Sequence, residues 1–128
     1  MNPNSPNRPV FDASAVLALL QGEPGAAKLM DLQPHAVVNA VNAAEVLAKL
    51  VSRGMPAEEA QAAYDALHLE TTSFDLALAS ASARYVYKGV SLGDRCFLAA
   101  AHRQGSGWTS DRDLGALFHT DPPLNFFR

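Results

Sequence analysis

The sequence has one cysteine, no long apolar run and no excess of positive charge. The lone Cys96 excludes a disulfide within the chain and fits a reducing compartment. Because the N-terminus carries no long apolar stretch, we expect neither a signal peptide nor a membrane-spanning helix, and we expect a cytoplasmic protein. The net charge of -3 argues against a protein that holds nucleic acid by a broad positive surface.

No spacing of histidine or cysteine in the chain fits a zinc site. The four histidines are isolated from one another, and we expect each to be structural or exposed: His35, His68, His102 and His119. We expect Cys96 to be a buried apolar filler on a helix. No internal repeat is present either, so 128 residues, of which 48% are hydrophobic and 18% charged, predict one domain with a sizeable core.

Short apolar segments alternate with helical patterns along the chain. We expect strands at residues 8–11, 35–39, 69–74 and 107–109, with a fifth, edge strand at 117–120. Strands separated by helices predict parallel pairing, right-handed crossovers and helices on both faces of the sheet. The expected fold is therefore α/β, with a parallel sheet of four or five strands between two helical layers.

The two ends of the chain differ from this pattern. Residues 1–9 contain three prolines and three asparagines, and we expect a flexible lead-in there, followed by a single domain over residues 10–128. The tail after residue 121 ends in apolar residues, which we expect to fold back onto the body.

Four acidic residues accompany the predicted strands: Asp12, Glu45, Asp94 and Asp111. The carboxyl ends of parallel strands share one edge of a sheet, so these side chains are expected to converge there. Clustered carboxylates raise one another's pKa unless a cation neutralises them. A set of oxygen ligands favours Mg²⁺ or Mn²⁺ over zinc. The sequence therefore predicts a site for such an ion.

Each acid also has an ordinary structural interpretation. Asp12 can favour the positive end of a helix dipole. Asn42 can cap a helix and form a capping box with Glu45, and Ser91 can do the same with Asp94. The joint position of the acids at consecutive strand–helix units nevertheless favours a shared site.

Neighbouring polar residues have similar double interpretations. Asp111 and Asp113 can stabilise a turn, and Asp113 is a reserve ligand. Ser14 is expected to cap a helix, although it could instead hold Asp12 or a metal-bound water. Thr109 and Ser110 are expected to support Asp111 through their hydroxyl groups.

Four sequence blocks resemble one known family. They are V-F-D-A-S-A-V-L-A-L-L at residues 10–20, N-A-A-E-V at 42–46, S-L-G-D-R-C-F-L-A at 91–99 and T-S-D-R-D-L at 109–114. From about Val10 to about His119 the chain resembles PIN-domain ribonucleases, specifically the VapC-type toxins of bacterial type II toxin–antitoxin pairs. The resemblance implies a three-layer α/β/α domain and a hydrolase that cleaves RNA.

The resemblance also implies roles for the four acids. Asp12 and Asp94 would ligate the main Mg²⁺ or Mn²⁺ ion, with Asp111 binding it directly or through water. Glu45 would orient or deprotonate the attacking water, or complete a second metal site. Arg95 could contact an RNA phosphate. Arg112 could do the same, although both arginines could equally be ordinary surface residues.

Two kinds of partner follow from the resemblance besides RNA. Relatives usually form homodimers, for which the helices around Leu29, Leu47 and Leu50 are candidates in this chain. They are also silenced by a cognate antitoxin. Two features depart from the family pattern: the compact, aromatic segment R-Y-V-Y-K-G-V at residues 84–90, and Asn39 in the place of a frequent serine.

Two other classes of protein remain open. A phosphoacceptor domain also places carboxylates around Mg²⁺, but it would need two adjacent acids after the first strand and a late lysine. Here Asp12 stands alone between Phe11 and Ala13, and residues 108–110 contain no lysine. A catalytically silent module that only binds a partner protein is the other alternative.

Overall fold

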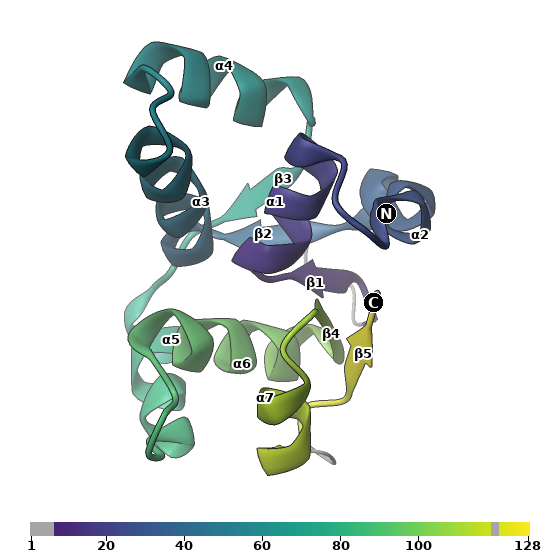
Figure 1. Ribbon diagram of the computed structural model, residues 1–128. Helices are drawn as coiled ribbons and strands as arrows, with labels where there is room; N and C mark the ends of the chain where they lie inside the picture. The colour runs from purple at the N-terminus through teal and green to yellow at the C-terminus, as the bar shows by residue number, and fades with distance from the viewer. Residues whose placement is uncertain (1–6, 119–120) are drawn as a thin grey trace.

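A computed structural model describes residues 7–118 and 121–128. Five parallel strands form one sheet in the order β3-β2-β1-β4-β5. The strands are β1 (Pro9–Phe11), β2 (Val37–Asn39), β3 (Glu70–Thr72), β4 (Ser106–Thr109) and β5 (Leu124–Phe126). Helices cover both faces of the sheet (Figure 1), which confirms the expected α/β/α layers.

The two helical layers pack on alternate residues of the central strands. One layer comprises α1 (Ala13–Gln21), α2 (Ala26–Leu32), α3 (Ala40–Ser52) and α4 (Ala57–Ala66). The other comprises α5 (Leu76–Ser82), α6 (Leu92–Gln104) and α7 (Arg112–Leu117). Phe11 and Val38 belong to the core of the first layer, whereas Val10 and Val37 belong to the core of the second. This alternation follows from the two-residue period of a strand.

The strand order reverses between β1 and β4. From β1 the chain moves to β2 and β3 on one side, and it later returns to add β4 and β5 on the other side. In open α/β sheets the connections leave such neighbouring strands in opposite directions and create a crevice at their carboxyl ends. The residues that follow Phe11 and Thr109 therefore lie where this fold class places its ligand site.

The expected lead-in is too long. Pro9 already belongs to β1, and the side chain of Arg8 is buried. Its Nε donates a hydrogen bond to the carbonyl oxygen of His35 at 3.1 Å, and its Nη1 lies 2.7 Å from a carboxylate oxygen of Glu70. The flexible segment predicted through residue 9 is thus wrong for Arg8 and Pro9, and residues 1–6 lie outside the described chain.

The fifth strand is not where the sequence indicated. Leu117 ends helix α7, and residues 119–120 of the expected strand lie outside the part of the chain that the structure describes. The edge strand β5 instead comes from the tail and pairs with β4, with Gly107 opposite Leu124. The buried ring of Phe127, which packs in the core of the first layer, fixes this end of the chain.

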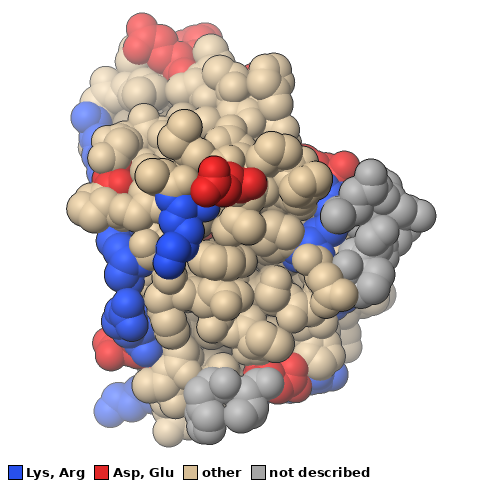
Figure 2. All heavy atoms as spheres, turned by 90° about the vertical axis from the view of Figure 1, so that its right-hand side faces the viewer, with Lys and Arg blue, Asp and Glu red and all other residues tan. Residues whose placement is uncertain are grey.

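Two further observations concern membrane-spanning helices and the distribution of surface charge. Within residues 7–118 and 121–128, no helix combines the length and the apolar composition needed to cross a bilayer. On the face in Figure 2, Lys and Arg side chains gather along one edge, with acidic groups among them and no continuous basic field.

Candidate functional site

Asp12 lies at the junction of β1 and α1. Its backbone N–H bonds to the carbonyl oxygen of Trp108 on β4 at 3.3 Å. Its Oδ1 accepts hydrogen bonds from the N–H of Ala15 at 2.9 Å and from the Ser14 hydroxyl at 2.6 Å. Asp12 is therefore the cap of α1, and the expectation that Ser14 caps the helix is wrong. Ser14 lies inside the first turn and holds the Asp12 carboxylate.

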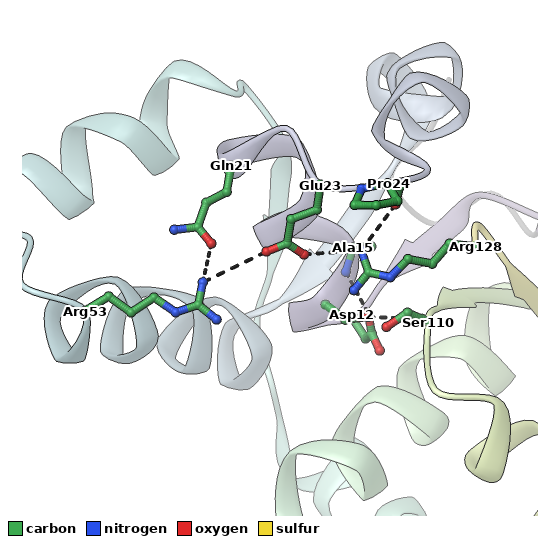
Figure 3. A network of polar contacts seen from close by, with 9 residues as sticks. Asp12, Ala15, Gln21, Glu23, Pro24, Arg53, Ser110 and Arg128 are labelled. Atoms are coloured by element: carbon green, nitrogen blue, oxygen red, sulfur yellow. Dashed lines mark hydrogen bonds and ion pairs between the residues drawn. The ribbon is translucent and has the colours of Figure 1, made fainter.

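The end of β4 completes this network. The buried hydroxyl of Thr109 donates to Oδ2 of Asp12 at 2.5 Å and accepts from the N–H of Asp111 at 3.0 Å. The N–H of Ser110 donates to the Ser14 hydroxyl at 3.1 Å. Asp12 and Ser110 accordingly lie together in Figure 3. Thr109 thus joins two of the predicted acids across the point where the strand order reverses.

Asp111 follows Thr109 and Ser110 and caps the short helix α7. Its Oδ1 accepts a hydrogen bond from the N–H of Leu114 at 3.0 Å, and the residue is exposed. Asp113, the reserve ligand, is also exposed and lies in the first turn of α7. Asp111 therefore performs a local role and still presents its carboxylate beside the Asp12 network.

Glu45 reaches the site from α3. Asn42 donates from one amide nitrogen to Oε1 of Glu45 at 2.6 Å and to the carbonyl oxygen of Gly93 at 3.1 Å. The Glu45 carboxylate lies so close to Gly93 that a Cβ there would be 2.2 Å from its Oε2. Asn42 is not the helix cap that the sequence suggested. Asn39 caps α3 by accepting from the N–H groups of Val41 and Asn42.

Asp94 lies in the first turn of α6, three residues after its cap. Its N–H donates to the Ser91 hydroxyl at 3.1 Å, and the N–H of Ser91 donates to Oδ2 of Asp94 at 3.1 Å. The predicted capping box is therefore confirmed, with Ser91 as the cap of α6. Because Gly93 contacts Glu45, Asp94 and Glu45 lie on adjoining turns of α6 and α3.

The pKa of Asp12 is raised from 3.8 to about 6. Burial is the largest cause, hydrogen bonds from Ser14, Thr109 and Ala15 act in the opposite direction, and the charge of Asp94 raises the pKa further. The charges of Asp12 and Asp94 therefore interact, which agrees with the two residues lying near the same end of the sheet. A cation between them would favour the ionised form of both.

The cysteine and the histidines that the structure describes lie where the sequence predicted them. The thiol is buried, and burial raises its pKa; the charge of Arg95 lowers the pKa and that of Glu45 raises it. Cys96 is therefore an apolar filler on α6, as expected, and an unreactive thiol. His35, His68 and His102 are exposed, as expected, whereas His119 lies outside the described residues.

The two candidate arginines bond to backbone carbonyl groups rather than to the four acids. Arg95 donates from Nη1 to the carbonyl oxygen of Val90 at 3.3 Å. Arg112 donates from Nη2 to the carbonyl oxygen of Arg128 at 2.9 Å, and its guanidinium lies 4.9 Å from the ring centre of Phe126. Among residues 7–118 and 121–128, no Lys or Arg side chain pairs with any of the four acids. The acidic edge, by which we mean Asp12, Glu45, Asp94 and Asp111, is therefore not neutralised by a basic side chain from that part of the chain.

Arg128 belongs to a separate network at the C-terminal end. Its Nη1 lies 3.2 Å from Oε1 of Glu23 and 3.2 Å from the carbonyl oxygen of Pro24. Glu23 also faces Arg53, which bonds to Gln21 (Figure 3). These contacts tie the last strand to the loop between α1 and α2 and to the end of α3.

The fit of a metal ion depends on the chemistry of these donors. Across the described part of the chain, no group of three or more His, Cys, Asp or Glu side chains is arranged to hold a metal ion. Asp12 and Asp111 follow β1 and β4, and Glu45 and Asp94 lie on adjoining turns of α3 and α6. Mg²⁺ retains several waters and is commonly bound through one or two carboxylates, so an open set of oxygen donors such as Asp12 and Asp94 suits it.

The leucines near the proposed dimer surface are buried or only partly exposed. Leu29 and Leu50 are buried in the core of the first layer, so these two side chains cannot themselves contact a second copy, and the dimer surface on the helices around them stays a prediction. Leu47 is partly buried and lines an apolar groove of about 470 Å³ between α3 and α4.

The protein is thus a three-layer α/β/α domain. Its carboxylates lie near the point of the parallel sheet where the strand order reverses, between β1 and β4. The family model of the PIN domain matches residues 10–117. The chain belongs to the PIN domain family, whose members are generally nucleases.

The fold is similar to that of solved structures, of which one is described. It is the crystal structure of VapBC2 from Rickettsia felis bound to a DNA fragment from their promoter. The TM-score is 0.67 at 14% sequence identity, and the match covers 92% of this chain and 96% of that chain. No curated protein matches.

Proposed function

We propose that this protein is a Mg²⁺-dependent ribonuclease, with Mn²⁺ as an alternative ion, and the toxin of a toxin–antitoxin pair. The observation that carries the proposal is the hydrogen-bonded chain from Asp12 through Thr109 to Asp111, with the charge of Asp94 acting on Asp12. Membership of the PIN domain family and the similarity in fold to VapBC2 support it.

In the proposed reaction, the acidic residues bind the metal ion and neighbouring hydroxyl groups orient them. Mg²⁺, when bound, would polarise a phosphoryl oxygen of the substrate and offset its charge. Asp12 and Asp94 would hold the ion, with Asp111 binding it directly or through water. Ser14 and Thr109 fix the orientation of Asp12. A phosphodiester hydrolysed this way would leave a 5′-phosphate and a 3′-hydroxyl.

The proposed role of Glu45 concerns the attacking water. Its carboxylate is exposed, is held at Oε1 by Asn42, and lies next to the turn that carries Asp94. An exposed carboxylate in a fixed orientation can accept a proton from a water molecule within hydrogen-bond reach. We assign Glu45 the orientation or deprotonation of that water, or the completion of a second metal site.

The proposed partners are RNA, a cognate antitoxin and a second copy of the chain. The likeness to a VapBC2 structure supports the antitoxin, and we place the encounter in the cytoplasm. The family match argues against the phosphoacceptor alternative. The silent binding module becomes the outcome expected if the purified protein binds partners but cleaves nothing.

The test compares the wild type with Asp94→Asn on single-stranded RNA, with Mg²⁺ and with a chelator. The substituted asparagine would retain the helix-capping geometry but lose the charge. We expect the wild type to cleave only with Mg²⁺ and the variant to be at least about 100-fold slower, because a metal ligand contributes several kcal/mol. Mapping the product ends checks for the 5′-phosphate.

Asp75→Asn is the matched control. Asp75 also caps a helix, accepting from the N–H of Leu78 at 2.9 Å, and it pairs with Arg103 rather than with the acidic edge. Its variant should cleave like the wild type. Equal cleavage by the wild type and Asp94→Asn would indicate a contaminating nuclease and contradict the proposal.

A further inference from the structure

The loop between Tyr85 and Val90 exposes large apolar side chains on a fixed backbone. Tyr85 and Val90 are buried, and the ring of Tyr85 packs edge-on against Phe118 at 5.4 Å between centres. Between them, Val86 is 69% exposed and Tyr87 is 57% exposed. The loop is therefore anchored in the core at both ends, while its middle residues face solvent.

A tight turn gives this loop its shape. The N–H of Val90 donates to the carbonyl oxygen of Tyr87 at 3.1 Å, and Gly89 has a φ of 84°. A positive φ at the third residue of a four-residue turn is the type II pattern, which glycine adopts without strain. Lys88 occupies the second position and is exposed. The turn thus presents Tyr87 and Lys88 outward next to each other.

The loop adjoins the candidate site directly. Val90 is followed by Ser91, whose hydroxyl accepts from the N–H of Asp94. The guanidinium of Arg95 bonds to the carbonyl oxygen of Val90, which brings this cation to the base of the loop. Leu92, at the start of α6, is 60% exposed. The exposed residues Tyr87, Lys88 and Leu92 thus lie within a few positions of the turn that carries Asp94, and Arg95 bonds to the end of the loop.

The charges of this segment favour nucleic acid over protein as its partner. Residues 86–95 contain two cations, Lys88 and Arg95, and one acid, Asp94, which belongs to the site itself, whereas the whole chain has a net charge of -3. Lysine is depleted from protein–protein interfaces but common in phosphate contacts. Exposed aromatic rings beside cations bind unpaired nucleotides, since every base has a face that can stack.

We propose that residues 86–95 form the RNA-binding side of the site. The base of an unpaired nucleotide next to the cleaved bond stacks on Tyr87, and Lys88 and Arg95 contact the flanking phosphates. This inference rests on the proposed ribonuclease function and specifies which residues of the chain contact the RNA. A paired base could not present its face to Tyr87, so duplex RNA should bind less well.

Binding is measured separately from cleavage, in the Asp94→Asn protein, by fluorescence anisotropy with a short labelled single-stranded RNA of mixed sequence. We expect Tyr87→Ala to weaken binding by about five- to a hundredfold, the range for loss of one base–aromatic stack. Tyr87→Trp should retain the affinity. Log affinity falls as log salt rises, and Lys88→Ala should make this slope less steep by about 0.7, as for one lost phosphate contact on a single strand.

Met30→Ala is the control, because Met30 is 61% exposed on α2 and belongs to neither the loop nor the acidic edge. It should bind RNA like its parent. Circular dichroism and thermal melting check that each variant folds, which the exposure of Tyr87 leads us to expect.

The outcomes separate this inference from the proposed function. If wild-type protein cleaves no RNA while binding still depends on Tyr87, the nuclease proposal fails and the RNA-binding surface stands. If Tyr87→Ala binds RNA like its Asp94→Asn parent and, in the wild-type background, cleaves like the wild type, the loop is not an RNA contact. If Tyr87→Ala changes only the oligomeric state in sedimentation, the loop is a protein interface and the inference is overturned.

Discussion

Asp12 has both a structural role at the start of α1 and a proposed role in binding the metal ion. One oxygen of its carboxylate caps α1 and binds Ser14, and the other binds Thr109 on the neighbouring strand. Those hydrogen bonds favour the ionised form, yet burial dominates and the pKa is raised to about 6. The fold thus holds this carboxylate in place at an energetic cost, which a bound cation would offset.

This raised pKa predicts how stability depends on pH in the absence of metal. Between the ordinary value of 3.8 and about 6, the folded protein binds a proton that the unfolded chain releases. Stability should therefore fall as pH rises through this window, by roughly 1–3 kcal/mol from this residue. Urea unfolding with a chelator present, from pH 4 to pH 7, measures the effect.

Asp12→Asn isolates the contribution of this one group. Other acids also titrate in the window, so the informative quantity is the difference between wild type and variant at each pH. That difference should shift in favour of the variant as pH rises. A difference that stays constant would show that Asp12 ionises normally.

Gly93 offers a steric test of the position of Glu45. Gly93 lies in the first turn of α6, where alanine is the better helix former by about 1 kcal/mol. An added Cβ would nevertheless meet the Glu45 carboxylate at 2.2 Å, and that flexible side chain would have to move. We expect Gly93→Ala to leave the free energy of unfolding unchanged or slightly higher and to reduce RNA cleavage by about tenfold or more.

A double-mutant cycle decides whether this loss acts through Glu45. In a Glu45→Gln background, where the charge at this position is already absent, Gly93→Ala should reduce cleavage little further. Additive losses would mean that the methyl group disturbs another part of the site.

At the scale of elements, α7 and β5 depend on each other. Gly115 on α7 receives the ring of Phe126 from β5, and a Cβ on Gly115 would lie 2.1 Å from that ring. The same ring lies under the guanidinium of Arg112, which bonds to Arg128. The last strand is thus packed against the helix that Asp111 caps.

Gly115→Ala should therefore destabilise the protein. The aromatic ring cannot withdraw without displacing the edge strand, so we expect a loss of about 1–3 kcal/mol, as for other overpacked positions. Chemical denaturation measures it. Ala116→Gly, at the exposed neighbouring position of α7, is the comparison and should cost about 1 kcal/mol from helix propensity alone. A Gly115→Ala protein as stable as wild type would show that β5 packs loosely.

At the scale of the whole molecule, the site joins parts of the chain that are far apart in sequence. Thr109 and Asp12 are separated by 97 residues and meet because β4 lies beside β1. Asp94 approaches from the opposite helical layer to α1 and α3. An ion bound between Asp12 and Asp94 would bind the folded protein and not the unfolded chain.

Mg²⁺ should consequently raise the melting temperature. A ligand at about 100 times its Kd stabilises the folded state by about 2.7 kcal/mol, which corresponds to several degrees for a domain of this size. We expect this shift in wild type and its loss in Asp94→Asn, with sodium chloride at equal ionic strength as the control. Equal shifts in both proteins would place the bound ion elsewhere.

The sequence determined the features that depend on neighbours along the chain. It determined the alternation of strands and helices and the capping box of Ser91 and Asp94, because each rests on contacts within a few residues. The family blocks also indicated the four acids, since those motifs are contiguous. These features account for the fold class and for the candidate residues.

Only the tertiary structure decided which of several local options was used. Asn39 rather than Asn42 caps α3, which leaves the Asn42 side chain free to bridge Glu45 and Gly93. The fifth strand forms from the tail because Phe127 is buried there. Both choices depend on burial and on hydrogen bonds between distant segments, whose free energy no short stretch of sequence contains.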